Sequence, residues 1–304
     1  MLRKGDLTQG GITGTLLHFT LPMMVGSFLQ QCYNIADTLI VGQCIGAGAL
    51  AAVGSAYTLM VFLISVLLGL AMGSGTVFSL HYGAGNHVAL RRSIFSSFVL
   101  IGIVTLILNV AVFIWLDPIL RLLQVPQDIY GMMRSYLWII FCGIVFTFIY
   151  NFYASLLRAV GDSVTPLWFL AVSVVLNIAL DLFFILQLDW GIQGAAAATV
   201  LAQGVAALGI IIYTYRRRPE LRWHHEDMCF DRTCLKEIAS FSTLTCIQQS
   251  VMNLGILMVQ GLVNSFGTAV MAAFAAAVKI DSFAYMPVQE FWNAFSTFIA
   301  QNFG

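Results

Sequence analysis

The sequence is poor in charge. Only 9% of its residues are Asp, Glu, Lys or Arg, whereas a soluble domain carries about 25%. A soluble fold needs that charge to cover its core with a hydrated surface, so such a fold is excluded. The formal net charge is zero, which gives no reason to expect a nucleic-acid partner.

Other features that would indicate a soluble enzyme are also missing. No H-E-x-x-H, G-x-S-x-G or P-loop pattern occurs, so neither an enzyme nor a cofactor is predicted. The scattered cysteines form neither a disulfide framework nor a closed zinc pattern, and four lie inside apolar segments, where thiols behave as small hydrophobes. These cysteines are Cys32, Cys44, Cys142, Cys229, Cys234 and Cys246.

Long hydrophobic runs dominate the chain. Hydrophobic residues make up 60% of it, and a run of about 20 is enough to cross a bilayer. We therefore predict an all-α, multi-pass membrane protein. The predicted spans are 16–42, 50–80, 94–116, 132–157, 164–187, 192–215, 238–263 and 269–302.

The positions of Lys and Arg predict the orientation of these spans. If the N-terminus is cytoplasmic, eleven basic residues fall on the cytoplasmic side and two, Arg121 and Arg134, on the other. This bias predicts a plasma-membrane protein with a cytoplasmic N-terminus. The eleven are Arg3, Lys4, Arg91, Arg92, Arg158, Arg216, Arg217, Arg218, Arg222, Arg232 and Lys236.

The chain also contains an internal repeat. Gln248 and Gln249 follow Gln30 and Gln31 at an interval of 218 residues, and further matches continue in the same order. We predict an N-lobe of six spans (1–215), a cytoplasmic loop (216–237) and the start of a C-lobe with two spans (238–304). A complete duplication of this kind would have about twelve spans, so a longer parent protein is expected.

Polar residues recur on one stripe of the first span. An acid in a membrane helix is costly and normally faces a bundle interior or a water-filled cavity, so Asp37 is interpreted as a proton or cation site. The alternative is a buried hydrogen bond between helices. Pro22 is a candidate hinge, although a tolerated kink would explain it equally. The stripe contains Pro22, Gly26, Gln30, Asn34 and Asp37, with Tyr33 beside it.

Two later spans offer partners for Asp37. Ser173, Asn177 and Asp181 share one helical face, and Thr199 lies on a face of small residues in the next span. Together these side chains would form an oxygen-rich pocket for a monovalent cation or a shared proton. A hydroxyl bonded only to its own helix is the alternative for Thr199. The last span contains Lys279, Asp281 and Glu290, and a mainly structural role is expected for Lys279 through pairing with a nearby acid.

Several segments resemble the multidrug and toxic compound extrusion (MATE) family of the MOP superfamily. The match begins with Thr20–Gly42, which includes Pro22, Tyr33, Asn34 and Asp37, and it continues in family order over nearly the whole chain. The other matching segments are Ala51–Gly54, Gly83–Asn86, Leu157–Asp162, Asn177–Asp181 and Gly191–Thr199.

The resemblance implies about eight of the twelve helices of a MATE-like bundle. It also implies export of cationic amphipathic drugs in exchange for Na⁺ or H⁺. In the family, the residues that match Asp37, Asn177, Asp181 and Thr199 form a cation site, with Tyr33 and Asn34 beside it, and we expect Gln30 to line the substrate path. No metal other than the coupling ion is expected.

The chain departs from the family pattern in one segment. Some members carry an acid in the seventh helix, but Ile247–Met252 contains none. Three alternatives remain open: a flippase for lipid-linked precursors in the same superfamily, a membrane enzyme, and a non-functional or structural fragment.

Overall fold

The computed structural model describes residues 7–304 apart from 9–10, 123–124, 126, 229–231 and 265–267. Within these residues the chain forms helices and no strands, which confirms the predicted all-α class. The long helices are α1 (Ile12–Cys44), α2 (Ala47–Gly83), α3 (His87–Leu122), α4 (Gln127–Cys142), α5 (Ile144–Ala159), α6 (Val164–Leu182), α7 (Gly191–Arg217), α8 (Arg232–Asn264) and α9 (Thr268–Phe303).

Two predicted spans are less regular than the sequence indicated. Span 132–157 is two helices, α4 and α5, which bend by 48° at Gly143. Span 164–187 ends in a π-helical turn, η1 (Phe183–Gln187). Among the described residues five helices are long and apolar enough to cross a membrane, or six if the bent pair is one span.

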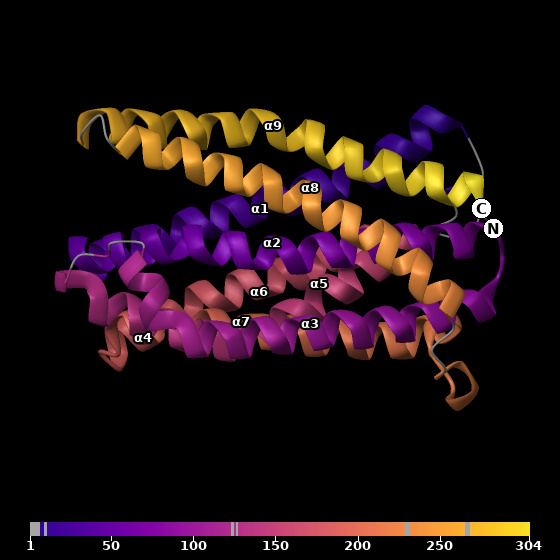
Figure 1. Ribbon diagram of the computed structural model, residues 1–304, viewed down its shortest axis with the longest axis horizontal. Helices are drawn as coiled ribbons and strands as arrows, with labels where there is room; N and C mark the ends of the chain where they lie inside the picture. Colours follow the sequence, from indigo (N-terminus) through magenta and orange to yellow (C-terminus); the bar gives the residue numbers. More distant parts are fainter. Residues whose placement is uncertain (1–6, 9–10, 123–124, 126, 229–231, 265–267) are drawn as a thin grey trace.

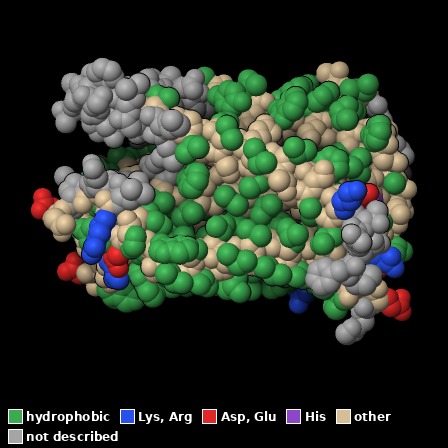
Figure 2. Space-filling view, viewed as in Figure 1, with side chains coloured by type: hydrophobic (Ala, Val, Ile, Leu, Met, Phe, Trp, Pro, Cys, Tyr) green, Lys and Arg blue, Asp and Glu red, His purple; other side chains and the backbone are tan. Residues whose placement is uncertain are grey.

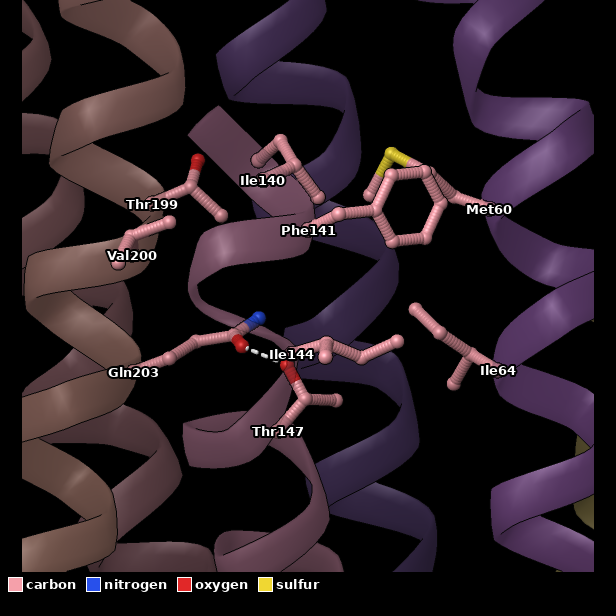
Figure 3. A pocket seen from close by; sticks show the side chains of 9 residues that line it. All are labelled: Met60, Ile64, Ile140, Phe141, Ile144, Thr147, Thr199, Val200 and Gln203. Carbon is pink, nitrogen blue, oxygen red and sulfur yellow. Dashed lines mark hydrogen bonds between the residues drawn. The ribbon is translucent and has the colours of Figure 1, made fainter. Parts of the chain in front are cut away.

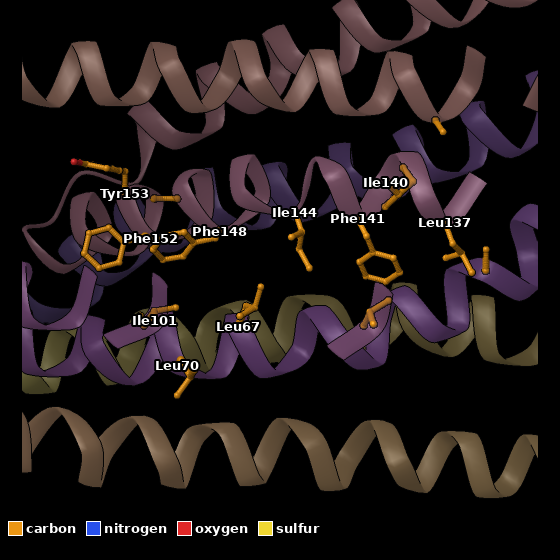
Figure 4. Packing of buried hydrophobic residues seen from close by; sticks show 14 of the residues in the cluster. Leu67, Leu70, Ile101, Leu137, Ile140, Phe141, Ile144, Phe148, Phe152 and Tyr153 are labelled. Atoms are coloured by element: carbon orange, nitrogen blue, oxygen red, sulfur yellow. The ribbon is translucent and has the colours of Figure 1, made fainter. Parts of the chain in front are cut away.

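The helices run roughly along one common direction (Figure 1). α8 and α9 form a hairpin beside α1 and α2, and α3 to α7 lie on the other side of α2. Both ends of the chain lie at the same end of the bundle, which we call the terminal end. The core lies between α2, α3 and the α4–α5 pair, and Leu67, Ile101, Phe141 and Phe152 are among its buried side chains (Figure 4).

The outer surface of the bundle is apolar. Hydrophobic side chains cover the face seen in Figure 2, and charged side chains gather towards its two ends. Trp168 and Val175 of α6 are 68% and 70% exposed. In water such a surface would drive aggregation, whereas in a bilayer it replaces lipid–lipid contacts. The surface fits a multi-pass membrane protein.

The segment that follows α7 is fixed to the bundle at the terminal end. Trp223 packs against Phe95 and Phe98 of α3, with ring centroids 6.1 and 5.6 Å apart. Asp227, which is only 3% exposed, accepts a hydrogen bond from Nε of Arg91 at 2.7 Å and one from the backbone N–H of His224 at 3.0 Å. This part of the predicted loop therefore adopts a defined position on α3.

A second polar anchor holds the start of α6 at the same end. Oδ1 of Asp162 accepts a hydrogen bond from the backbone N–H of Thr165 at 3.0 Å, and Oδ2 lies 3.3 Å from a guanidinium nitrogen of Arg218. The carboxylate thus caps a helix start, where the first N–H groups have no partner within the helix. It also ties α6 to the end of α7.

Candidate functional site

The candidate site is centred on a carboxyl group of α1. Asp37 lies seven residues before the end of α1 and is 8% exposed, with its side chain directed towards the α6 side of the helix. A helix rises 1.5 Å per residue, so Asp37 lies about 10 Å inside the end of α1 that is remote from the terminal end. The exposed residues of α1, such as Leu21 and Leu39, lie on other faces of the helix.

Helix α6 supplies the second carboxyl group. Asp181 is fully buried and Asn177, one turn earlier, is 1% exposed. The carboxyl groups of Asp37 and Asp181 lie close enough to interact directly. Two ionised carboxylates at this separation repel strongly in a low-dielectric interior. The contact therefore requires either a shared proton or a cation.

Helix α7 completes the cluster with Thr199. The side-chain amide of Asn177 donates to Oδ2 of Asp181 at 2.9 Å and accepts from the backbone N–H of Thr199 at 3.1 Å. The hydroxyl groups of Tyr33 and Thr199 are 3.3 Å apart, and Oγ1 of Thr199 also donates to the carbonyl of Ala195 at 3.1 Å. The amide thus fixes α6 against α7, and the tyrosine connects α7 to α1.

One oxygen of each acid has no hydrogen-bond partner among the described residues. These atoms are Oδ1 of Asp37 and Oδ1 of Asp181, and both are buried. Buried polar atoms are almost always paired, so these two carboxylate oxygens are available to bind a proton, a cation or water. Oxygen ligands suit hard cations and protons. The described residues contain no group of three or more His, Cys, Asp or Glu that a transition metal would require.

The structure brings together five of the residues predicted from the sequence: Tyr33, Asp37, Asn177, Asp181 and Thr199. The other three predicted residues lie outside this cluster. Asn34 directs its amide to Oε1 of Gln31 at 3.2 Å, and no hydrogen bond among the described residues joins half-buried Gln30 to the cluster. Pro22 lies fifteen residues before Asp37, and α1 is one continuous helix through it.

The sequence analysis missed Tyr136 of α4. This tyrosine is buried and lies close enough to Asp37, Tyr33 and Asp181 to interact with their charges. No stripe of polar residues marks this position in the sequence, because Tyr136 is the one described residue that α4 contributes to the cluster. Only the packing of α4 against α2 and α7 places its hydroxyl group near the acids.

A small pocket adjoins the cluster on the other side of Thr199 (Figure 3). The hydroxyl group of Thr147 donates a hydrogen bond to Oε1 of Gln203 across it. Apart from Thr147, Thr199 and Gln203 its walls are apolar, and they come from α2, α4, α5 and α7. The apolar lining residues are Met60, Ile64, Ile140, Phe141, Ile144 and Val200.

The family model for MatE matches residues 22–183, more than half of the chain. The chain belongs to the MatE family. The matched range includes Asp37, Asn177 and Asp181, and Thr199 follows it. The family resemblance predicted from the sequence is thereby confirmed.

Relatives and solved structures agree with this membership of MatE. The chain is 32% identical to the probable multidrug resistance protein YpnP of Bacillus subtilis, over its whole length and 68% of YpnP. It is 26% identical to the multidrug export protein MepA of Staphylococcus saprophyticus, over 95% of the chain and 64% of MepA. The chain thus spans about two-thirds of these proteins.

A solved structure has the same fold. It is described as the outward-facing conformation of a multidrug resistance MATE family transporter of the MOP superfamily. It superposes with a TM-score of 0.91 over 99% of this chain and 68% of that protein, at 23% sequence identity. The predicted MATE-like helical bundle is confirmed, and at this identity the superposition supports the fold alone.

Proposed function

We propose that this chain belongs to a secondary active antiporter of the plasma membrane, with a cytoplasmic N-terminus. The antiporter exports cationic amphipathic compounds in exchange for Na⁺ or H⁺. Asp37 and Asp181 carry the coupling ion, Asn177 and Thr199 hold the two acids in place, and Tyr33 lines the site. The observation that carries the proposal is the pair of buried carboxyl groups, each with one unpaired oxygen.

The two carboxyl groups provide the negative charge that exchange of a cation requires. When the ion leaves, one of two adjacent carboxylates must be neutralised or separated from the other, because both cannot remain charged side by side in a low dielectric. Ion binding and release therefore favour different positions of α1 relative to α6. A ligand shifts such an equilibrium only by its difference in affinity for the two states.

Drug export follows if the drug prefers the opposite state. Coupling between two ligands is reciprocal, so an ion that favours one position of α1 disfavours a drug that needs the other. In this proposal Pro22 is the point at which α1 bends between the two positions. The names of the relatives, which refer to multidrug resistance and export, support the substrate class.

The test is the substitution Asp37→Asn in the complete coding frame. Asparagine keeps the size and loses the charge, so the ion loses a charge-assisted contact worth about 1.5–3 kcal/mol. We expect ion affinity, and with it ion-driven efflux of a fluorescent cationic dye, to fall at least about tenfold. Membrane vesicles with an imposed Na⁺ gradient or an imposed H⁺ gradient identify the ion.

Asp189 provides a matched control. It is exposed and has a left-handed φ of 54°, which asparagine adopts as readily as aspartate. Asp189→Asn should therefore leave efflux unchanged. Undiminished ion-driven efflux in the Asp37→Asn variant would reject the site assignment. If neither an Na⁺ gradient nor an H⁺ gradient drives dye efflux by the unmodified protein, antiport is rejected.

A further inference from the structure

The α8–α9 hairpin meets α1 and α2 through an unusually close crossing. A Cβ atom added to Gly69 of α2 would lie 2.6 Å from Cα of Cys246, and one added to Gly73 would collide with the backbone of Ser242. Both pairs are four residues apart on their helices, so one glycine face lies directly on one small-residue face of α8. Methyl groups at either glycine would force the two helices apart.

Hydroxyl groups reinforce this crossing. Oγ of Ser242 donates to the carbonyl of Leu70 at 3.1 Å and lies 3.2 Å from Oγ of Ser74. At the terminal end itself, Gln301 of α9 donates to the carbonyl of Ala159 at 2.5 Å and accepts from the backbone N–H of Leu7 at 3.2 Å. The hairpin is thus joined to the other helices by polar contacts as well as by packing.

A third contact involves an acid outside the cluster of Asp37 and Asp181, which we call the exchange site. Glu290 of α9, which is partly buried, accepts a hydrogen bond from the hydroxyl group of Ser27 of α1 at 2.7 Å. Next to it, the rings of Phe28 and Phe283 meet edge to face with centroids 6.1 Å apart. Ser27 precedes Asp37 by ten residues, about 15 Å along the helix, so this carboxyl group lies well away from the exchange site.

These contacts lie on the terminal side of Asp37. On α1 and α2 they involve residues 27–28 and 69–74, and on α8 and α9 they involve residues 242–246 and 283–301. All of these lie in the middle of their helices or in the half nearer to the terminal end. Asp37 lies in the opposite half of α1. The conformation is therefore one in which the hairpin is held against α1 and α2 on the terminal side of the exchange site.

We propose that the Ser27–Glu290 hydrogen bond is a latch that holds this side of the transporter closed while the exchange site is reached from the other side. The inference rests on the proposed antiport. Glu290 acts as a positioning residue: it touches neither ion nor drug, and it sets how long α1 stays against α9. The close packing of Gly69 and Gly73 of α2 against α8 forms the contact surface that the latch keeps closed.

The native Cys246 provides a reporter of the closed state. Its backbone lies against Gly69 and its side chain is only partly exposed, so a thiol reagent should label it faster when the crossing opens. The experiment uses the complete coding frame with Cys246 as its single cysteine, the others being replaced by alanine. A membrane-impermeant maleimide is applied to inside-out and right-side-out vesicles, and the rate of labelling is measured.

We expect Ser27→Ala and Glu290→Ala each to raise the labelling rate about fivefold from one side of the membrane, the size expected for loss of one hydrogen bond. Because both substitutions remove the same bond, the double variant should label no faster than either single variant. Ser27→Thr and Glu290→Gln retain a donor and an acceptor, so both should remain within twofold of the parent.

Two substitutions serve as controls. Ser296→Ala removes a hydroxyl group from the exposed face of α9, and Glu226→Gln neutralises an exposed acid elsewhere, so neither should change the labelling rate. Equal labelling after detergent denaturation verifies that each variant contains the same amount of reactive protein. The amount of each variant in the membrane is also measured. If an alanine variant folds poorly, the Ser27→Thr and Glu290→Gln variants keep the test informative.

The latch can be disproved independently of the proposed antiport. Unchanged labelling in both alanine variants overturns the latch. It is also overturned if Glu290→Gln opens the crossing as much as Glu290→Ala while Ser27→Ala has no effect, because the carboxyl group then acts through its charge. Labelling requires no transport, so loss of function in Asp37→Asn leaves this measurement unaffected.

Discussion

Two buried carboxyl sites lie in opposite halves of the bundle, and they differ in how their oxygens are paired. Asp227, at the terminal end, is surrounded by donors from Arg91 and His224. Asp37 and Asp181, in the other half, contact each other, and each keeps one buried oxygen without a partner. A buried carboxylate surrounded by donors holds its segment in place, whereas one with an unpaired oxygen costs stability and is free to bind a proton or a cation.

The strongest way to test this contrast is to neutralise one acid from each site. Asp181→Asn should lower ion-driven dye efflux at least about tenfold, since the ion loses a charge-assisted contact. The same variant should not lower the melting temperature in detergent, because the neutral amide removes the repulsion between the two adjacent acids. Asp227→Asn should do the reverse, with normal efflux and a loosened segment after α7.

Paired measurements of efflux and melting temperature on the two variants decide the outcome. If both variants lose stability equally and keep efflux, the unpaired oxygens have no functional meaning. If both lose efflux, the docked segment takes part in transport.

A smaller effect is expected at Thr199, whose hydroxyl group contacts both Tyr33 and its own helix. Thr199→Val keeps the shape and removes a hydrogen bond worth about 0.5–1.5 kcal/mol, so the apparent ion affinity should fall roughly two- to tenfold. The dependence of efflux on ion concentration measures it.

Thr105 of α3 is the matched control for this substitution. Its hydroxyl group is also buried and donates to the carbonyl four residues earlier, that of Ile101, at 2.7 Å. Thr105→Val should leave ion dependence unchanged. Equal behaviour of the two valine variants would mean that the Thr199 hydroxyl group serves only its own helix.

The smallest effect concerns pH at the terminal end. Burial alone would raise the pKa of the Asp227 carboxyl, but the backbone N–H of His224 and the guanidinium of Arg91 outweigh it and hold that pKa below its ordinary value. A lowered pKa in the folded state stabilises the docked segment above about pH 4, and this contribution is lost as pH falls through the lowered value.

Limited proteolysis of the segment after α7, with an acid-active protease between pH 5 and pH 2, measures this loss. Cleavage should accelerate only at the acidic end for the parent protein. Asp227→Asn should be cleaved quickly and at a rate that depends less on pH, whereas Glu226→Gln should resemble the parent. Cleavage that is equally fast at every pH in the parent would show that Asp227 does not hold the segment.

The sequence predicted the fold and most of the polar cluster because both follow from short-range rules. Hydrophobic runs mark helices, and residues three or four positions apart share a helical face, so Asn177 and Asp181 could be paired before their helix was placed. The meeting of Asp37 with that face was inferred from the chemical cost of buried acids and from family likeness. The lobe boundaries and the roles of all the predicted site residues stay predictions.

What the sequence did not predict depends on contacts between distant residues. Ser27 meets Glu290 across 263 positions, and neither residue is unusual within its own helix. Tyr136 reaches the acids only through the packing of α4. For Lys279, which we expected to have a mainly structural role, and for Asp281, the side chains lie outside the described residues.

The bend at Gly143 has a consequence for the proposed ion site. A Cβ atom there would lie 2.5 Å from Cγ2 of Val200, so the side chain of Val200 in α7 rests directly on the backbone of the bend. Val200 is the immediate neighbour of Thr199. The missing side chain at Gly143 therefore lets α7 approach the bend closely, and it helps to position Thr199 in the proposed ion site although Gly143 itself lies outside that site.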